Sequence, residues 1–186
     1  MNTKEVCSAL ILGIRDYFRK NNFKKAVIGL SGGLDSSVAT CLVARALGSK
    51  NIVAVLMPDI GTTSPKSVKN AEMLAKKLKI KRHIISINDF VRFFENLGKK
   101  MHYKNKIYSI SNVKARTRMM VLYYFANLEN ALVIGTSDKS EIALGYTTKY
   151  GDNAADILVI GDLWKPEVIE MGRFLGVPEA ILRNKS

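Results

Sequence analysis

The sequence predicts an α/β protein whose parallel sheet is covered by helices on both faces. Short apolar segments alternate along the chain with longer segments in which apolar residues recur at helical spacing. The short segments are apolar throughout instead of on every second residue, which is typical of strands covered on both faces. A length of 186 residues with 47% hydrophobic content suits a single domain over residues 1–186.

The first part of the chain reads as helix, strand, loop and helix. Apolar residues recur at helical spacing from Val6 to Phe18. Residues 26–30 form a short apolar strand that breaks at a Ser-Gly-Gly sequence, and residues 36–47 return to helical spacing. We therefore expect a tight strand-to-helix turn at the Ser-Gly-Gly sequence.

The same alternation continues along the chain. Further strands are expected at residues 52–57, 83–87 and 131–134, and further helices after the Ser64-Pro65 cap, at residues 112–127 and at residues 165–175. Residues 99–109 are basic, polar and aperiodic, which predicts a mobile segment. Residues 145–156 show no period and are too long for a simple connection, so we expect them to be functional.

Composition narrows the class of protein without deciding the function. The net charge of +13 favours anionic partners, either nucleotides or nucleic acid, although many lysines belong to solvated helix faces. Cys7 and Cys41 lie in apolar helical stretches and are expected to be buried, not paired or metal-bound. The chain shows no signal-peptide pattern and no apolar run of roughly 18 residues, so no membrane partner and a cytoplasmic location are expected.

The sequence Ser-Gly-Gly-Leu-Asp-Ser-Ser at residues 31–37 predicts an anion site. It joins a strand to a helix start, where free N–H groups and the positive helix end attract phosphate. Asp35 would repel phosphate unless Mg²⁺ lay between them, so this loop predicts a metal-bound nucleotide. The alternative is an ordinary glycine-rich turn in which Asp35 only caps the helix.

A second group of polar residues follows the strand at residues 131–134. Thr136 and Glu141 could meet Asp35 where neighbouring strands end, since parallel sheets bind ligands beyond the carboxyl ends of their strands. Glu141 would then be a second carboxylate for magnesium. Lys165 lies at the start of a helix, where the helix dipole disfavours a positive charge. A bound phosphate therefore explains the presence of this lysine better than helix stability does. Arg116, in a helix with an apolar surface, needs an anionic partner, and a structural ion pair is the alternative.

These segments resemble known enzymes. SGGLDSS resembles the PP-loop of the N-type ATP pyrophosphatases, which cleave ATP between the α and β phosphates and form an adenylate. NVKARTRM, VIGTSDKSE, GYTTKYGDNAAD and IGDLWK are similar to successive signatures of the NAD synthetases, in the order of that family. The resemblance covers nearly the whole chain and implies a Rossmann-like fold of the adenine nucleotide alpha hydrolase type.

The resemblance also implies roles for particular residues. The ATP contacts would be Gly29, Leu30, Ser31, Gly32, Gly33, Leu34, Asp35, Ser36, Thr136 and Lys165. Asp35 and Glu141 would hold Mg²⁺, and Lys165 and Asp35 would be the catalytic residues. Deamido-NAD would be bound by Arg116, Lys149 and Asp156.

The implied reaction consumes ATP, deamido-NAD and ammonia and gives NAD, AMP and pyrophosphate through an adenylate. The chain leaves no room for a glutaminase domain, which implies free ammonia or a separate source of it. A homodimer is implied, with Val113, Met120 and Tyr124 as interface candidates.

The sequence departs from the family at three places. Ser111 and Asn153 stand where glycine is usual, and the chain ends before the usual Pro-Ser-Ala loop, so a truncated enzyme that binds MgATP but turns over slowly or not at all is expected. One alternative is a tRNA-modifying PP-loop enzyme, suggested by the charge and by residues 99–106, although the two cysteines are poorly placed and nucleic acid is not expected. The second alternative is a remnant without enzymatic activity that binds nucleotides or forms dimers.

Overall fold

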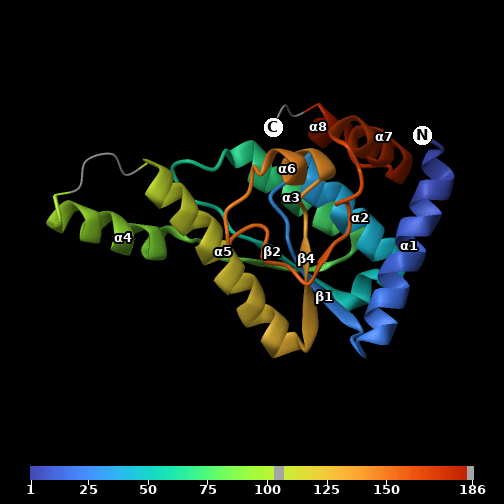
Figure 1. Ribbon diagram of the computed structural model, residues 1–186, viewed down its shortest axis with the longest axis horizontal. Coiled ribbons are helices and arrows are strands. Elements are labelled where there is room, and N and C mark those ends of the chain that lie inside the picture. Colours follow the sequence, from blue (N-terminus) through green and yellow to red (C-terminus); the bar gives the residue numbers. More distant parts are fainter. Residues whose placement is uncertain (103–106, 184–186) are drawn as a thin grey trace.

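Five parallel strands form one sheet in the order β3-β2-β1-β4-β5, with helices on both faces (Figure 1). The computed structural model describes residues 1–102 and 107–183. The strands are β1 (Lys25–Gly29), β2 (Ile52–Leu56), β3 (Lys81–Ile84), β4 (Ala131–Gly135) and β5 (Ile157–Leu158). This architecture confirms the predicted fold class.

The helices differ in length and in role. They are α1 (Thr3–Lys20), α2 (Leu34–Leu47), α3 (Pro65–Leu78), α4 (Asn88–Lys100), α5 (Ile107–Glu129), α6 (Lys139–Leu144), α7 (Lys165–Leu175) and α8 (Glu179–Leu182), with a short 3₁₀ helix η1 at Ser49–Asn51. α2 begins where the glycine-rich loop ends, and Ser64 caps α3 by accepting a hydrogen bond from Ser67 N, as its sequence predicts. No helix in the two described ranges is long and apolar enough to cross a bilayer.

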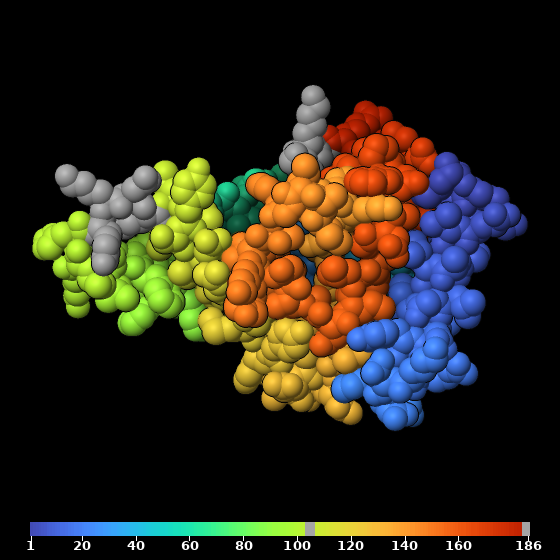
Figure 2. All heavy atoms as spheres, in the orientation of Figure 1, coloured from blue at the N-terminus to red at the C-terminus, as the bar shows by residue number. Residues whose placement is uncertain are grey.

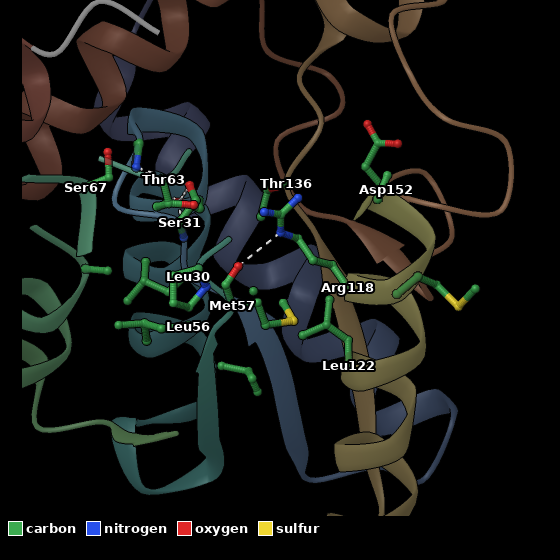
Figure 3. A pocket seen from close by; sticks show the side chains of 18 of the residues that line it. Leu30, Ser31, Leu56, Met57, Thr63, Ser67, Arg118, Leu122, Thr136 and Asp152 are labelled. Carbon is green, nitrogen blue, oxygen red and sulfur yellow. Dashed lines mark hydrogen bonds between the residues drawn. The ribbon is translucent and has the colours of Figure 1, made fainter. Parts of the chain in front are cut away.

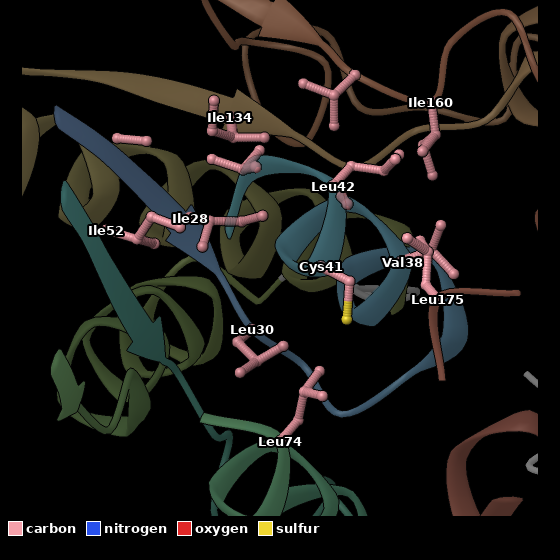
Figure 4. Packing of buried hydrophobic residues seen from close by; sticks show 14 of the residues in the cluster. Ile28, Leu30, Val38, Cys41, Leu42, Ile52, Leu74, Ile134, Ile160 and Leu175 are labelled. Carbon is pink, nitrogen blue, oxygen red and sulfur yellow. The ribbon is translucent and has the colours of Figure 1, made fainter. Parts of the chain in front are cut away.

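The sheet separates two hydrophobic cores. Successive strand residues point to opposite faces, so Ile28 packs in one core while its neighbour Val27 packs in the other. The larger core contains apolar residues of α1, α2 and α7, and Figure 4 shows Ile28 facing Leu42 and its neighbours there. The smaller core lies against α5, which contacts β1 and β4. Burial on both faces explains why the central strands are apolar throughout.

Both cysteines are buried free thiols within the larger core, as expected. Burial raises the pKa of the Cys41 thiol to about 11, so the thiol form predominates at neutral pH. Cys41 is therefore a packing residue of α2.

Some boundaries differ from those expected. β3 runs from Lys81 to Ile84 instead of from 83 to 87. It is an edge strand whose residues are mostly exposed, so its own apolar pattern is weak. Its register is fixed by pairing with β2, in which Val53 lies opposite Lys81. The helix expected at 112–127 extends over Ile107–Glu129, and α4 was not predicted. Of the segment expected to be mobile, Lys99 and Lys100 end α4 and 107–109 begin α5, while 103–106 lie outside the described residues.

Candidate nucleotide-binding site

A cavity of about 650 Å³ lies at the carboxyl ends of β1, β2 and β4 (Figure 3). Its walls come from the glycine-rich loop, from the chain after β2, from α5 and from the end of β4. Of the residues predicted to bind ATP, it is lined by Gly29, Leu30, Ser31, Gly33, Ser36 and Thr136. The position agrees with the rule that parallel sheets bind ligands beyond their carboxyl edges.

Two serines form hydrogen bonds within the loop that follows β1. Ser31 Oγ accepts a hydrogen bond from Gly33 N at 3.2 Å and lies 2.9 Å from Ser36 Oγ. Within the described ranges no group accepts from the N–H groups of Leu34, Asp35 or Ser36 in the first turn of α2. These free amides at a helix N-terminus can bind an anion, as the sequence predicts.

Gly32 fits the loop against α3. Its φ is +82°, in the left-handed region, and a Cβ at this position would overlap the carbonyl oxygen of Ser67 in the first turn of α3. Gly32 and Leu34 do not line the cavity themselves. The role of Gly32 in the structure is to let the loop pack closely against α3.

A lysine and three carboxylates gather beside this loop. Lys165 Nζ lies 2.7 Å from Asp35 Oδ1 and 3.0 Å from Asp138 Oδ2. The backbone N–H of Lys165 donates to Ser140 Oγ at 3.0 Å, which joins the start of α7 to α6. Burial alone lowers the pKa of Lys165, but the close carboxylates of Asp35 and Asp138 raise the pKa overall, so the ammonium form is favoured.

Glu141 is the third carboxylate of this group. Its Oε2 accepts a hydrogen bond from Asp138 N at 3.2 Å, and Asp138 Oδ1 accepts from Glu141 N at 2.8 Å, which forms a capping box at the start of α6. Burial raises the pKa of Glu141, and the negative charges of Asp35 and Asp138 raise it further. The hydrogen bond from Asp138 N and the charge of Lys165 lower the pKa, but the overall shift is upward. The structure thus brings Asp35, Glu141 and Lys165 together.

The donor set fits a magnesium ion shared with a nucleotide. Asp35 and Glu141 offer carboxylate oxygens, which hard divalent cations prefer. In the described part of the chain no three His, Cys, Asp or Glu side chains are arranged to hold a metal ion by themselves. Mg²⁺ typically uses one or two carboxylates and takes its remaining ligands from phosphates and water. These residues fit that pattern.

The segment at 145–156 is ordered by contacts with α5. Arg116 Nε donates to the carbonyl oxygen of Lys149 at 3.1 Å, and Thr148 Oγ1 donates to Asn112 Oδ1 at 3.2 Å. Gly151 is buried, and a Cβ there would lie 3.0 Å from the Cβ of Ala115. The structure therefore places Arg116 and Lys149 side by side, and both side chains are exposed.

Asp156 is engaged differently. Its Oδ2 accepts from Val133 N at 2.7 Å and its Oδ1 accepts from the Tyr123 hydroxyl at 3.2 Å. Burial, together with the charge of Asp156, raises the pKa of Tyr123 to about 12. Both carboxylate oxygens thus connect β4 with α5, and the binding role of Asp156 stays a prediction.

Sequence reasoning missed Arg118. Its guanidinium faces the cavity beside Thr136, and its Nε donates to the carbonyl oxygen of Met57 at 3.3 Å (Figure 3). No carboxylate within the described ranges forms a salt bridge with it, and burial lowers the pKa of Arg118. A half-buried cation that faces a cavity suits an anionic ligand. The available signal was the pair Arg116 and Arg118 in one helix, of which only the first was assigned.

Asp59 and Asp138 were missed as well. Asp59 is buried and forms a 2.5 Å salt bridge with Lys114, and it also accepts a hydrogen bond from the Thr62 hydroxyl, which holds the loop after β2 against α5. Asp138 is fully buried. An acid three residues before Glu141 is the sequence pattern of a capping box, so Asp138 could have been recognised as a helix cap.

The comparisons with known proteins agree with this geometry. The NAD synthase family model matches residues 6–186. A curated relative named NH3-dependent NAD+ synthetase, from Staphylothermus marinus, is 45% identical over 175 residues, which are 93% of this chain and 62% of the relative. A relative of the same name from Archaeoglobus fulgidus is 42% identical over 185 residues, and the match covers 100% of this chain and 73% of the relative.

A solved structure shows the same fold. The NMN synthetase of Francisella tularensis superimposes with a TM-score of 0.91 at 34% identity, covering 100% of this chain and 76% of that chain. The chain therefore spans roughly three fifths to three quarters of the length of these three proteins. With the glycine-rich loop, the carboxylate pair and Lys165 in place, the chain belongs to the NAD synthase family.

Proposed function

We propose that the protein is an ammonia-dependent NAD synthetase. ATP adenylates the nicotinate carboxylate of deamido-NAD with release of pyrophosphate, and ammonia then displaces AMP to give NAD. The observation that carries this proposal is the assembly of free amides at the start of α2 next to Asp35, Glu141 and Lys165. Family membership and relatives named NH3-dependent NAD+ synthetase support the choice of reaction.

The geometry suggests how ATP is held. The N–H groups of Leu34, Asp35 and Ser36 and the hydroxyl of Ser31 would donate to phosphate oxygens, while Thr136 would contact the nucleotide in the adjoining cavity. Gly29 and Leu30 would lie along it at the end of β1. This arrangement would expose the α phosphorus to attack by a substrate oxygen, and no side-chain nucleophile is required.

Lys165 and Asp35 would be the catalytic residues. Lys165 would donate to oxygens of the leaving pyrophosphate, where negative charge develops during the reaction. Mg²⁺ held by Asp35 and Glu141 would supply further charge compensation there. Catalysis would thus depend on positioning and electrostatics.

Deamido-NAD is expected on the α5 side of the site. Arg116, Lys149 and Asp156 are its proposed contacts, and the hydrogen bond from Arg116 to the Lys149 backbone supports the first two. A pyrophosphate-bearing dinucleotide would pair with the exposed cations of Arg116 and Lys149.

Arg116 and Arg118 should separate the two substrates. Arg116→Ala is expected to weaken deamido-NAD binding about tenfold or more and to change MgATP binding little, because Arg116 lies outside the cavity. Arg118→Ala should instead weaken MgATP binding, because its guanidinium faces that cavity. Calorimetric titration of each ligand alone measures both. Equal losses of both ligands in Arg116→Ala would give Arg116 a structural role.

A homodimer is proposed through α4 and α5. Met120 and Tyr124 of α5 are 49% and 62% exposed, and Phe90, Phe93 and Phe94 of the preceding helix α4 are exposed as well. Figure 2 shows α4 and the beginning of α5 projecting from the body of the molecule, while Met120 and Tyr124 lie farther along α5. An exposed apolar surface of this kind is typical of a protein interface.

Tyr124→Glu is expected to convert the dimer into monomers, because a charge would be buried at the contact. Leu12→Glu, at a residue that is 68% exposed on α1, is the matched control and should leave the dimer intact. Sedimentation velocity measures both. A Tyr124→Glu variant that sediments like the unchanged protein would remove α5 from the interface.

The proposed adenylation can be tested without ammonia. Labelled pyrophosphate should enter ATP when deamido-NAD and Mg²⁺ are present, since the first step is reversible, and tRNA should have no effect. Exchange that requires tRNA and not deamido-NAD would favour a tRNA-modifying enzyme. The absence of a nucleic-acid partner and the cytoplasmic location stay predictions of the sequence.

A further inference from the structure

The two partners of Lys165 differ in their surroundings. The Asp138 side chain is 0% exposed and the Asp35 side chain is 17% exposed. Asp138 Oδ1 caps α6, while Asp138 Oδ2 accepts no well-aligned hydrogen bond within the described ranges and lies 3.0 Å from Lys165 Nζ. The charge of Asp138 is thus compensated mainly by Lys165.

This difference decides which contact of Lys165 can be broken. Removing the ammonium from Asp138 would leave a buried carboxylate without its counter-ion, which is strongly unfavourable. Removing it from Asp35 costs less, because the Asp35 carboxylate is partly accessible and water can solvate its charge.

Lys165 and a metal ion would compete for the negative charge of the Asp35 carboxylate. Lys165 Nζ lies 2.7 Å from the same Asp35 carboxylate that is proposed to bind Mg²⁺. A cation arriving alone at this carboxylate is repelled by the ammonium, whereas a cation arriving with phosphates also brings a new partner for Lys165.

We propose that Asp138 is a positioning residue, the permanent anchor of Lys165, and that Lys165 covers Asp35 until the metal-bound nucleotide arrives. Lys165 then turns from Asp35 to the phosphates while its contact with Asp138 is kept. This inference rests on the proposed ATP site. It predicts that metal and nucleotide bind as a unit and that metal alone binds weakly.

The first test measures Mn²⁺ binding without nucleotide, by the electron paramagnetic resonance signal of the free ion. The double variant Lys165→Met/Asp138→Asn uncovers Asp35 without changing the net charge of the site. It should bind Mn²⁺ about tenfold or more tighter than the unchanged protein. The matched control, Lys139→Met/Asp162→Asn, makes the same charge change nearby and should have no effect. Equal Mn²⁺ affinity in all three proteins would overturn the proposal.

The second test examines the anchor through thermal unfolding. Lys165→Met alone should lower Tm, because it leaves Asp138 buried without a counter-ion, and adding Asp138→Asn should recover most of the loss. Adding Asp35→Asn instead should recover little. If Asp138→Asn lowers Tm equally with and without Lys165, Asp138 is only a helix cap and the proposal fails. Neither test uses deamido-NAD or ATP, so failure here is distinguishable from failure of the proposed reaction.

Discussion

Asp35→Asn is expected to lower the rate of Mg²⁺-dependent adenylation by about 100-fold or more while leaving the protein folded. The amide is similar in size to the carboxylate but lacks the charge that would hold a divalent cation against the phosphates. Lys165 keeps its buried partner Asp138, so the packing of α7 against α2 should not change. The effect should therefore appear in catalysis and not in stability.

Pyrophosphate release with saturating ATP and deamido-NAD measures this effect. Asp162→Asn is the matched control, since Asp162 is exposed and forms no salt bridge within the described ranges. It should release pyrophosphate at the rate of the unchanged protein. Near-normal release by Asp35→Asn at ordinary Mg²⁺ concentrations would remove Asp35 from the metal site.

Gly32→Ala should lower the free energy of unfolding by about 2 to 5 kcal/mol. Part of this cost is the left-handed backbone, since φ at Gly32 is +82°. The other part is the overlap of the new Cβ with the carbonyl oxygen of Ser67, which must move with the first turn of α3. The same movement would shift Ser31 and Gly33, so MgATP binding should be lost as well.

Gly48→Ala separates the two contributions. Gly48 has the same φ of +82°, but a Cβ there would meet nothing within 4 Å. Its variant should lose only a backbone contribution of about 1 to 3 kcal/mol and should keep MgATP binding. Urea unfolding and nucleotide titration measure both variants. Equal losses of stability would mean that the approach of the loop to Ser67 is unimportant.

Local patterns were enough to predict the part of the site that local chain geometry builds. The loop at Ser31–Ser36 follows an apolar strand and precedes a helix, and both its place in the fold and its free amides follow from that order. The meeting of Asp35 with Glu141 was predictable because β1 and β4 are neighbours whose carboxyl ends lie at one edge of the sheet.

Other features depend on contacts that no local pattern contains. Asp138 was not predicted as a partner of Lys165, since the two meet only after the chain passes through β5 and returns at α7. α4 was missed although Phe90, Phe93, Phe94 and Leu97 recur at helical spacing, and these four side chains are exposed instead of packed in a core. The edge strand β3 was misplaced because its register is set by β2.

The most direct test of the proposed function is NAD formation by purified protein with ATP, Mg²⁺ and deamido-NAD, comparing ammonium with ammonia-free glutamine. Nicotinate mononucleotide is tested in parallel, because one structural relative is named NMN synthetase. We expect NAD and AMP in equal amounts with ammonium and deamido-NAD, and none with glutamine alone. NAD formation driven by glutamine alone, or amidation of the mononucleotide in preference to deamido-NAD, would contradict the proposed function.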